Sequence, residues 1–535
     1  MNFHIHHYLD YHAKHSPHNE AVSCLDEKLS YCELQKNANQ LAHRLIEQGV
    51  KPGSRVGIYM DKCLEMATAI YGILKAGAVY VPLDPFAPVE RLASIIDNCD
   101  IDILLSHNNK KKRLLKITPL TKNPLFIIGV DKLEQQLPDQ QFHSQAWQWV
   151  YTHNNIANPE VDIVESDLAY IIYTSGSTGI PKGIMHTHYS CLSYVQRAVV
   201  ELEIKAYDKL GNHCPLHFDI SIFDWFATVV AGASIILIPD EYTKLPVSYC
   251  ELIAKSQMTV LFTVPFALIQ LAQCGAIEKQ DMSHLRWISF GGEPMLVKHL
   301  YSIMQQLPGV VFDNVYGPAE VNACTHYLVK NLKQDASAVP IGKMYDYAQA
   351  LIVDESNVPV NTNQIGELLV KSPTMMKGYW ARPDLNENAF YHASAPVNST
   401  NVKRELSDTY YRTGDLVKVD EEGLMWFIGR KDRQVKVRGY RIELDEIEAI
   451  LVSHDNIEEA AVYTVAAEDK STQLHASYTV KADAMITNRD MRKFLKSKLA
   501  HYAVPSEIDK VQVFPRTSSG KIDRLNLSKK ATICP

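Results

Sequence analysis

The sequence predicts an α/β protein, with a large N-terminal region of two helix-covered sheets plus a small β-barrel-like subdomain, followed by a small α+β C-terminal domain. Segments with helical and with strand-like apolar spacing alternate over most of the first 330 residues, which is typical of parallel sheets covered by helices. From about 339 to 430, short strand-like segments are separated by Gly, Pro and Asn, which favours a small antiparallel barrel or sheet. A separate α+β unit follows over 432–535.

The expected elements of the N-terminal region follow one another in alternation. Residues 31–48 have the apolar spacing of a helix, and residues 55–59 form a short apolar segment that suits a buried strand. Further helices are expected at 64–75, 88–98 and 188–202, and further strands at 79–83, 168–172, 234–238, 259–263 and 287–290. In sheets of this kind, binding sites form at the carboxyl ends of the strands.

The C-terminal unit mixes the two kinds of element without a repeat. Strands are expected at 434–437, 460–465, 474–480 and near 511–514, and helices at 444–453 and 489–499. Such a unit is large enough to form a compact module of its own.

Composition and charge exclude several classes of protein. The formal net charge of −7 argues against a broad nucleic-acid-binding surface. The most apolar stretch, 67–83, contains Lys75 as well as Gly and Pro, and it is too short to span a bilayer. The N-terminus lacks the apolar region of a secretory signal. We therefore expect a soluble, cytoplasmic protein that binds neither nucleic acid nor membrane.

Cysteine and histidine do not form an evident metal motif in the sequence. The ten cysteines are scattered, and the closest pair, Cys24 and Cys32, lacks metal-like spacing, so reduced thiols are expected. His4, His6 and His7 could bind a metal ion, but nothing downstream in the sequence completes such a site.

Residues 173–183, Tyr-Thr-Ser-Gly-Ser-Thr-Gly-Ile-Pro-Lys-Gly, form the most informative motif. They follow the expected strand at 168–172 and precede the expected helix at 188–202. Glycines let backbone N–H groups approach an anion, and hydroxyls and an ammonium add donors, so the loop suits a triphosphate. The spacing differs from that of the common P-loop, and a flexible linker would not be flanked by a strand and a helix. The candidate binding residues are Thr174, Ser175, Gly176, Ser177, Thr178, Gly179 and Lys182.

Many further motifs stand in a characteristic order along nearly the whole chain. They occupy residues 29–34, 74–85, 218–221, 314–320, 366–368, 411–416, 429–436, 438–443 and 520–524. With them, the chain resembles a stand-alone amino-acid adenylation domain of the adenylate-forming superfamily, which includes nonribosomal peptide synthetases, acyl-CoA synthetases and luciferases.

The resemblance implies a ligase that forms an aminoacyl-AMP from an amino acid and MgATP, and then passes the acyl group to a thiol. Lys521 is implied as the catalytic cation between the carboxylate and the phosphate, and Glu320 as the ligand of Mg²⁺. Asp415 is implied to bind the ribose hydroxyls with help from Arg430, and Tyr316 to stack on adenine. Further ATP- or AMP-binding residues implied by the motifs are Gly291, Gly292, Glu293, Asn314 and Gly317.

Asp219 is implied to pair with the α-ammonium of the substrate, since a buried carboxylate needs a partner. The alternative is that Asp219 caps a helix that begins at Ser221. The implied side-chain pocket is uncharged and lined by Ile220, Phe223, Phe266, Ile288, Phe290, Val315, Ala323 and Cys324. It favours a small apolar side chain, proline or alanine first and then glycine or valine. If one Phe points into the core, the pocket would admit leucine or phenylalanine.

The resemblance also implies a mobile C-terminal domain and a separate partner. Asp432 resembles a hinge between an N-terminal core over 1–430 and the domain over 432–535, and Gly439 would approach the pantetheine arm. No carrier module is evident, so the acceptor is expected to be a separate phosphopantetheinylated carrier protein. Two residues depart from the family pattern: Ala319 replaces a Thr, and Asp445 replaces a Gly and could cap a helix. The alternatives are a coenzyme A ligase of the same superfamily and a non-catalytic adenylate-binding regulator.

Overall fold

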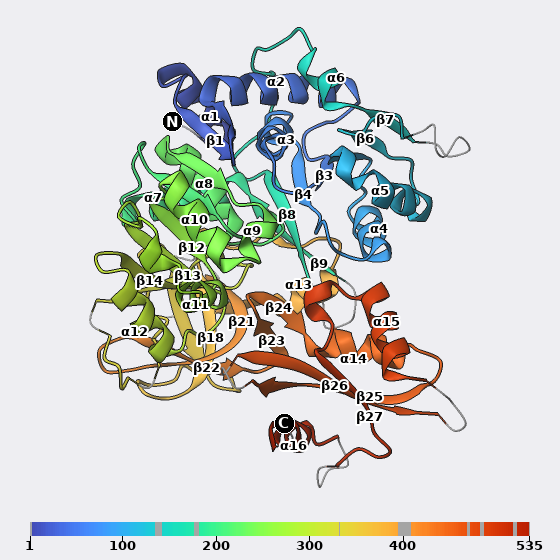
Figure 1. The fold of residues 1–535 in the computed structure, drawn as a ribbon, viewed down its shortest axis with the longest axis vertical. Helices are drawn as coiled ribbons and strands as arrows, with labels where there is room; N and C mark the ends of the chain where they lie inside the picture. Colours follow the sequence, from blue (N-terminus) through green and yellow to red (C-terminus); the bar gives the residue numbers. More distant parts are fainter. Residues whose placement is uncertain are drawn as a thin grey trace, which may run out of the picture.

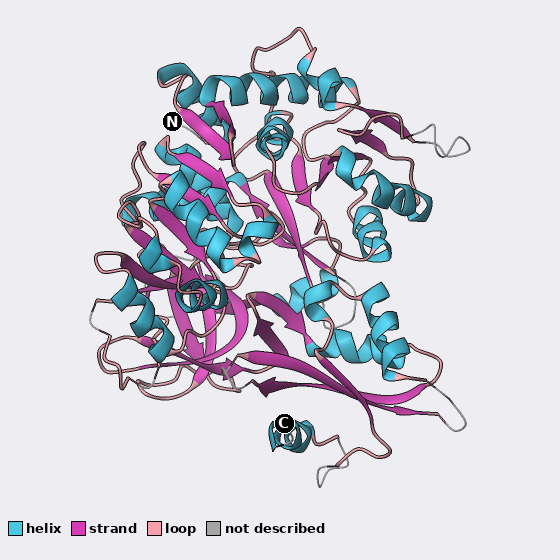
Figure 2. Ribbon diagram, in the orientation of Figure 1, coloured by secondary structure: helices cyan, strands magenta, loops and turns pink. Residues whose placement is uncertain are grey.

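The computed structural model describes residues 3–133, 142–175, 181–330, 332–336, 338–393, 408–467, 471–481, 486–516 and 522–533. A large N-terminal part, blue to yellow in Figure 1, lies against a smaller part in orange and red that contains the C-terminus. Two long sheets dominate the larger part, and Figure 2 shows helices around them. Among the described residues, no helix combines the length and the apolar character needed to cross a membrane.

The first long sheet has nine strands in the order β16-β15-β14-β13-β12-β10-β11-β1-β2. Its six central strands, from β14 to β1, pair in parallel, and β2, β15 and β16 pair antiparallel. The strands are β1 (Glu20–Cys24), β2 (Glu27–Ser30), β10 (Lys209–Asn212), β11 (Ser234–Leu237), β12 (Val260–Thr263), β13 (Trp287–Gly291), β14 (Val311–Tyr316), β15 (Thr325–Leu328) and β16 (Lys343–Met344).

The second long sheet has eight strands in the order β19-β9-β8-β4-β3-β5-β6-β7. The strands from β8 to β7 pair in parallel, whereas β9 and β19 pair antiparallel. They are β3 (Arg55–Tyr59), β4 (Val79–Pro82), β5 (Ile103–Ser106), β6 (Phe126–Ile128), β7 (His143–Gln145), β8 (Leu168–Thr174), β9 (Lys182–Thr187) and β19 (Gly378–Tyr379).

Helices cover both faces of these sheets, as the alternating pattern predicts. The largest core cluster joins both sheets through α2 (Tyr31–Glu47), α3 (Leu64–Lys75), α7 (His188–Glu201) and α8 (Ser221–Ala231). On the other face of the first sheet, a second cluster includes α10 (Pro246–Ser256), α11 (Pro265–Gln273) and α12 (Val297–Gln306). On the other face of the second sheet, α4 (Val89–Asn98) and α5 (Lys111–Ile117) complete a third. The remaining N-terminal helices are α1 (His6–His15), α6 (Trp147–Tyr151), α9 (Asp240–Thr243) and α13 (Pro383–Ala389).

A five-stranded antiparallel sheet forms the β-rich subdomain. Its strands are β17 (Gln349–Val353), β18 (Gly366–Lys371), β20 (Phe390–Ala393), β21 (Asp408–Val419) and β22 (Met425–Arg430). The long strand β21 pairs with β18, β20 and β22. This sheet lies within the range in which the sequence predicts a β-rich subdomain.

The C-terminal part begins with a hairpin of β23 (Gln434–Val437) and β24 (Tyr440–Glu443). A three-stranded sheet follows, made of β25 (Ile457–Ala466), β26 (Thr472–Val480) and β27 (Glu507–Lys510). Apolar side chains of α14 (Leu444–Val452) and α15 (Asn488–Lys498) pack on one face of it, and α16 (Arg524–Ile533) packs on the other. The α/β fold class with its small α+β C-terminal unit is therefore confirmed.

Two local predictions are wrong. The strand expected near 511–514 is not present, because the pairing with β26 ends at Lys510 and the side chain of Val513 is 79% exposed. Asp445 does not cap α14, whose N-cap residue is Glu443 without a side-chain cap. Asp445 instead forms an ion pair with Arg433.

Candidate active site

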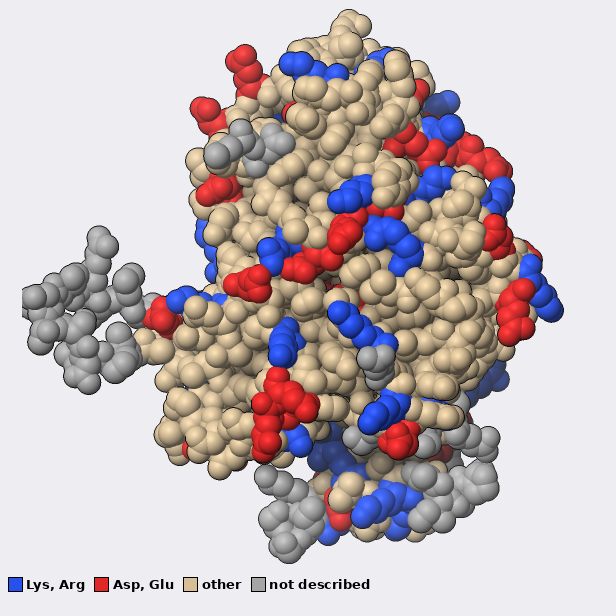
Figure 3. Space-filling view, turned by 90° about the vertical axis from the view of Figure 1, so that its left-hand side faces the viewer, with Lys and Arg blue, Asp and Glu red and all other residues tan. Residues whose placement is uncertain are grey.

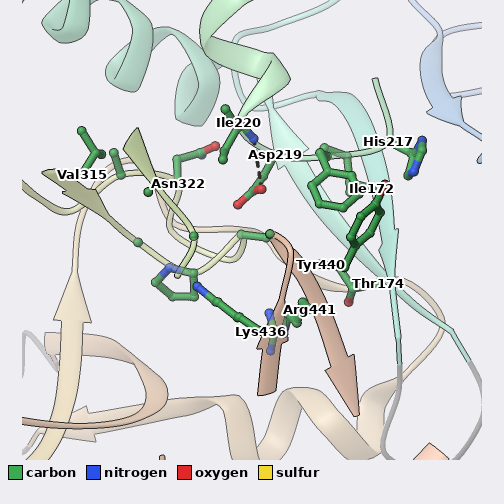
Figure 4. A pocket seen from close by; sticks show the side chains of 18 of the residues that line it. Ile172, Thr174, His217, Asp219, Ile220, Val315, Asn322, Lys436, Tyr440 and Arg441 are labelled. Atoms are coloured by element: carbon green, nitrogen blue, oxygen red, sulfur yellow. Dashed lines mark hydrogen bonds between the residues drawn. The ribbon is translucent and has the colours of Figure 1, made fainter. Parts of the chain in front are cut away.

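A cavity of about 100 Å³ lies between the first sheet, the N-terminal end of α8 and the β23–β24 hairpin. Figure 4 shows Asp219 projecting into it, with Lys436 and Arg441 approaching from the hairpin. Residues of β8, β13 and β14 reach it at or beyond the carboxyl ends of these strands, where ligands bind in such sheets. The predicted site residues that line it are Thr174, Ser175, Asp219, Ile220, Gly291, Gly292, Val315, Gly317, Ala323, Asp415 and Arg430.

The described ends of the predicted phosphate loop contribute three polar side chains. Thr174 Oγ1 is buried and has no hydrogen-bond partner among the described residues. Ser175 Oγ donates to the backbone oxygen of Arg441 over 2.8 Å, and Lys182 Nζ lies 3.2 Å from a carboxylate oxygen of Glu443. The predicted residues Gly176, Ser177, Thr178 and Gly179 lie outside the described residues, as does Lys521.

Glu320 is fully buried and already faces a cation. Both of its oxygens accept hydrogen bonds from Arg441 Nη1, over 2.9 and 2.8 Å, and Tyr379 donates its hydroxyl over 2.8 Å. Burial alone would raise the pKa of this carboxyl, but the Arg441 guanidinium, together with Lys182 and the hydroxyl of Tyr379, outweighs burial and lowers the pKa to about 2. The carboxylate expected to bind Mg²⁺ is therefore ionised and is paired with the C-terminal hairpin in this structure.

Asp415 lies at the centre of a hydrogen-bonded network. Tyr316 donates its hydroxyl to one carboxylate oxygen over 2.5 Å, and Arg430 donates to the other over 2.5 Å. Asp415 and Arg430 are direct neighbours on β21 and β22. Arg430 also binds both oxygens of Asp432, over 2.6 and 2.7 Å. The residue expected to bind the ribose is thus connected through Arg430 to the predicted hinge.

Asp219 has no cationic partner among the described residues. One oxygen accepts the backbone N–H of Ile220 over 3.0 Å, and α8 has no side-chain cap at its first residue. The capping alternative is therefore not what the structure shows. Burial raises the pKa of Asp219, and Lys436 opposes that shift through its charge without forming an ion pair. This carboxylate faces the cavity with capacity to bind an external cation.

The predicted side-chain pocket needs correction at Ile288 and Phe290. Successive side chains of a strand point to opposite faces, and on β13 these two pack in the second core cluster, beside α10, α11 and α12. Trp287 belongs to the first cluster, on the cavity side of the sheet. Ile288 and Phe290 therefore do not line the cavity.

Three other expected pocket residues also lie outside the cavity lining. Phe223 is buried behind Phe262, with its ring 5.5 Å from that ring. Phe266 lies under the Arg438 guanidinium, 5.6 Å from the ring centre. Cys324 packs in the core cluster of the β-rich subdomain. The cavity therefore has fewer phenylalanines around it than motif matching implies.

Asn314 and Glu293 serve the backbone instead of the cavity. Asn314 Nδ2 donates to the backbone oxygen of Pro340 over 2.8 Å, and Glu293 accepts the backbone N–H of Phe266 over 3.0 Å. Neither side chain is among those that line the cavity. Here they position loops that surround it.

Several lining residues are not predicted by the sequence motifs. Phe262 lies on β12, next to Thr263, and the alternation of side chains along a strand is the signal that could have pointed it toward the cavity. Lys436, Tyr440 and Arg441 lie in motifs that the sequence singles out, but the motifs alone imply no role for them. Tyr194 and His217 carry no signal in the sequence that would mark them.

The hairpin closes the cavity on one side. Its turn residues Arg438 and Gly439 have φ angles of 54° and 81°, as a two-residue type I′ turn requires. A Cβ at Gly439 would lie 2.6 Å from a side-chain carbon of Val264, so the turn has no room for a larger residue. Tyr440 stacks on Tyr502 with ring centres 3.8 Å apart.

The surface carries both basic and acidic side chains. On the face in Figure 3, Lys and Arg side chains are interspersed with Asp and Glu, and the described residues there form no broad basic area. This agrees with the formal net charge of −7.

Comparison with known proteins places the chain in a family. Residues 9–380 match the AMP-binding enzyme family, and residues 446–521 match the C-terminal domain of AMP-binding enzymes. An L-proline–[L-prolyl-carrier protein] ligase of Streptomyces coelicolor is 32% identical over 513 residues, which cover 94% of this chain and 92% of that protein. Its counterpart in Pseudomonas fluorescens is 28% identical and covers 96% of both chains.

Other relatives are much longer. Bacitracin synthase 1 of Bacillus licheniformis is 32% identical over 523 residues, which are 97% of this chain, and the chain spans only 9% of the length of that protein. Two solved structures share the fold. An amide bond synthetase of Marinactinospora thermotolerans has a TM-score of 0.84 at 22% identity, covering 99% of this chain and 100% of that one. The Vibrio cholerae adenylation domain AlmE, solved with glycyl-adenosine-5′-phosphate, has a TM-score of 0.83 at 24% identity, covering 99% and 98%.

The family model alone covers more than half of the chain, and it spans the phosphate-loop motif, Asp219 and Glu320. The chain belongs to the AMP-binding enzyme family, and the resemblance seen in the sequence is confirmed.

Proposed function

We propose that this protein activates a small apolar amino acid with ATP to form an aminoacyl-AMP, and then transfers the aminoacyl group to the phosphopantetheine thiol of a separate carrier protein. The observation that carries the proposal is Asp219, a carboxylate in the cavity with no cationic partner among the described residues. An α-ammonium would supply that partner, whereas a simple carboxylic acid would leave the charge unpaired. Two relatives of similar length are named as prolyl-carrier protein ligases.

In the first step, a carboxylate oxygen of the amino acid attacks the α-phosphorus of ATP, and pyrophosphate leaves. Asp219 would hold the ammonium, and Thr174 would donate its hydroxyl to a phosphate oxygen. Lys521 would supply a positive charge where negative charge develops. Electrostatic stabilisation of that kind is usually the largest contribution to catalysis of such steps.

Asp415 can still accept ribose hydroxyls, because a carboxylate has about four acceptor positions and, among the described side chains, Tyr316 and Arg430 take two of them. Glu320 offers the hard oxygen ligands that Mg²⁺ prefers, and its burial requires a cation. When bound, Mg²⁺ would neutralise charge on the phosphates. Because Arg441 holds both oxygens of Glu320 here, the hairpin must withdraw before that carboxylate is free.

The described arrangement therefore suits the second step better than the first. The hairpin lies over the cavity, and the turn residue Gly439 lines it, where a thiol must reach the adenylate. The thiolate attacks the acyl carbon, and AMP leaves. Rotation about Asp432 would exchange the hairpin for the segment that carries Lys521, in the manner of a domain hinge.

The substrate class follows from the corrected lining. Side chains of Ile220, Phe262, Val315 and Ala323 give an apolar surface near Asp219. A polar side chain would lose its hydration there without compensation. We propose proline or alanine as substrate, followed by glycine or valine, and only modest discrimination among them, because one methylene is worth about 1–3 kcal/mol.

The test is ATP–pyrophosphate exchange with each of the common amino acids, followed by acceptor assays with the best one. Exchange is expected with small apolar amino acids, together with transfer to a phosphopantetheine-bearing carrier. Exchange restricted to charged or large polar amino acids would refute the pocket. Transfer to free coenzyme A in place of a carrier would support the coenzyme A ligase alternative, and the absence of exchange with every acid would support a non-catalytic regulator.

A further inference from the structure

Three histidines gather at the start of the first helix, and none of them lines the cavity. His4, His6 and His7 each offer a ring nitrogen, and these three nitrogens lie within 4.8 Å of one another. His4 Nδ1 and His7 Nε2 are 3.4 Å apart. That separation is near the distance between two ligand atoms that each lie about 2.0–2.1 Å from one tetrahedral metal ion. The rings of His6 and His7 are also in contact, with centres 4.8 Å apart.

The cluster contains a buried nitrogen that has no hydrogen-bond partner in the part of the chain that the structure describes. The side chain of His6 is only 9% exposed, and its Nδ1 has no hydrogen-bond partner among the described residues. His4 Nε2 also lacks a partner among the described residues, but it is not the ring nitrogen that faces His7. A buried polar atom without a hydrogen-bond partner destabilises the folded state. A bound ion would give the buried Nδ1 of His6 the partner that it lacks among the described residues.

A fourth histidine, distant in the sequence, positions the cluster. His188 Nδ1 accepts the backbone N–H of Ile5 over 3.4 Å, and Ile5 stands between two of the proposed ligands. The His188 ring centre lies 5.2 Å from that of His4. His188 therefore fixes the segment that presents the imidazoles, as residues behind metal ligands commonly do.

The surroundings permit a cation. The ammonium of Lys75 lies near the cluster, but it forms an ion pair with Asp10, which offsets its charge.

We propose that His4, His6 and His7 form a binding site for a divalent transition-metal cation, with zinc as the preferred ion. Imidazole suits Zn²⁺, and three protein ligands leave a fourth position for water. The strand β9 separates the phosphate loop from His188, and its length of six residues corresponds to about 20 Å. Because none of the three histidines lines the cavity, we assign the site a structural role: it would hold the N-terminal segment in the conformation that contacts His188, and it does not depend on the proposed adenylation activity.

The experiment uses the full chain, freed of metal by a chelator and then equilibrated with zinc. Elemental analysis is expected to find about one zinc ion per chain, held in the three-histidine site. Cobalt(II), used as a spectroscopic probe, is expected to give the intense visible absorption of a tetrahedral site. Zinc is expected to raise the thermal unfolding midpoint, because a ligand that binds the folded state stabilises it.

Three single substitutions, His4→Asn, His6→Asn and His7→Asn, test the ligands. Each is expected to weaken zinc binding at least about 100-fold, since even a residue behind the ligands is commonly worth 10–100-fold. His15→Asn is the matched control, because His15 is on the same helix but outside the cluster.

His4 and His7 are only half-buried, so their variants are expected to fold even if His6→Asn does not. Zinc binding by His4→Asn and His7→Asn equal to that of the wild type would overturn the proposal, as would a wild type that binds no zinc. Equal loss in His15→Asn would also overturn it. Pyrophosphate exchange measured on the same samples separates a failure of this site from a failure of the proposed function.

Discussion

Replacing Asp219 by Asn tests the proposed contact with the substrate ammonium. Removing one partner of a buried ion pair costs about 3–5 kcal/mol, and the lower end applies here because the carboxylate faces a cavity. A loss of about 3 kcal/mol corresponds to a fall of about 150-fold in kcat/KM. ATP–pyrophosphate exchange with the best amino acid measures this directly.

Two controls make the Asp219 result specific. The same acid without its amino group has no ammonium to pair, so the wild type and Asp219→Asn should activate it equally poorly. Thermal stability should not fall, because Asp219 has no ion pair among the described residues and caps no helix. A similar loss with both acids, or a loss of stability of the roughly 0.5–2 kcal/mol that a missing helix cap causes, would rule out a contact between Asp219 and the substrate ammonium.

Four further predictions concern catalysis, domain movement and pH. Lys521→Ala should slow adenylation by about 10²–10³-fold, as loss of one transition-state donor does, and leave transfer from preformed adenylate nearly unchanged; pyrophosphate exchange and thioester assays compare the two. Asp432→Pro should keep adenylation but lower thioester formation steeply, because a fixed φ traps one arrangement; equal loss of both would make the residue structural. Arg441→Gln should lower thioester formation more than exchange, because the hairpin loses its buried contact with Glu320; unchanged transfer at saturating carrier would contradict this. Burial lowers the pKa of His186 to about 4, so the unfolded chain binds the proton at a higher pH than the folded chain does. The free energy of unfolding should therefore fall by about 3 kcal/mol as the pH falls from 6.5 to 4. Urea unfolding at these two pH values should show a smaller fall for His186→Gln than for the wild type.

Much of the fold could be predicted because its signals are local. The strand β3 and the helix α3 have the predicted bounds, since each is a continuous apolar segment that the core buries. The strand expected near 511–514 is absent for a reason that is not local. Residues 511–514 have the apolar alternation of a strand, but the preceding strand β27 stops pairing with β26 at Lys510.

The candidate site also has features that local motifs predict and features that they do not. Thr174, Asp219 and Asp415 line one cavity although they are far apart in the sequence, because each belongs to a motif with a fixed place in the fold. Motif matching does not report which face of β13 a side chain takes, so it places Ile288 and Phe290 wrongly. The alternation of side chains along β13 assigns both residues to the face that packs in the second core cluster.

Contacts between distant segments have no signal in the sequence. The pairing of Arg441 with Glu320 depends on where the C-terminal domain lies, which is a property of the domain arrangement. The approach of His188 to the N-terminal histidines depends on the place of β9, the strand that precedes His188, in the second sheet. Neither residue stands near its partner in the sequence.

In the proposed mechanism, a carboxylate oxygen of an amino acid attacks the α-phosphorus of ATP at this cavity. The most direct test supplies the preferred amino acid with ¹⁸O in its carboxylate and analyses the nucleotide by mass spectrometry after turnover. The proposed mechanism predicts one ¹⁸O atom in the AMP that leaves. Unlabelled AMP, or label found in inorganic phosphate together with ADP, would contradict adenylation.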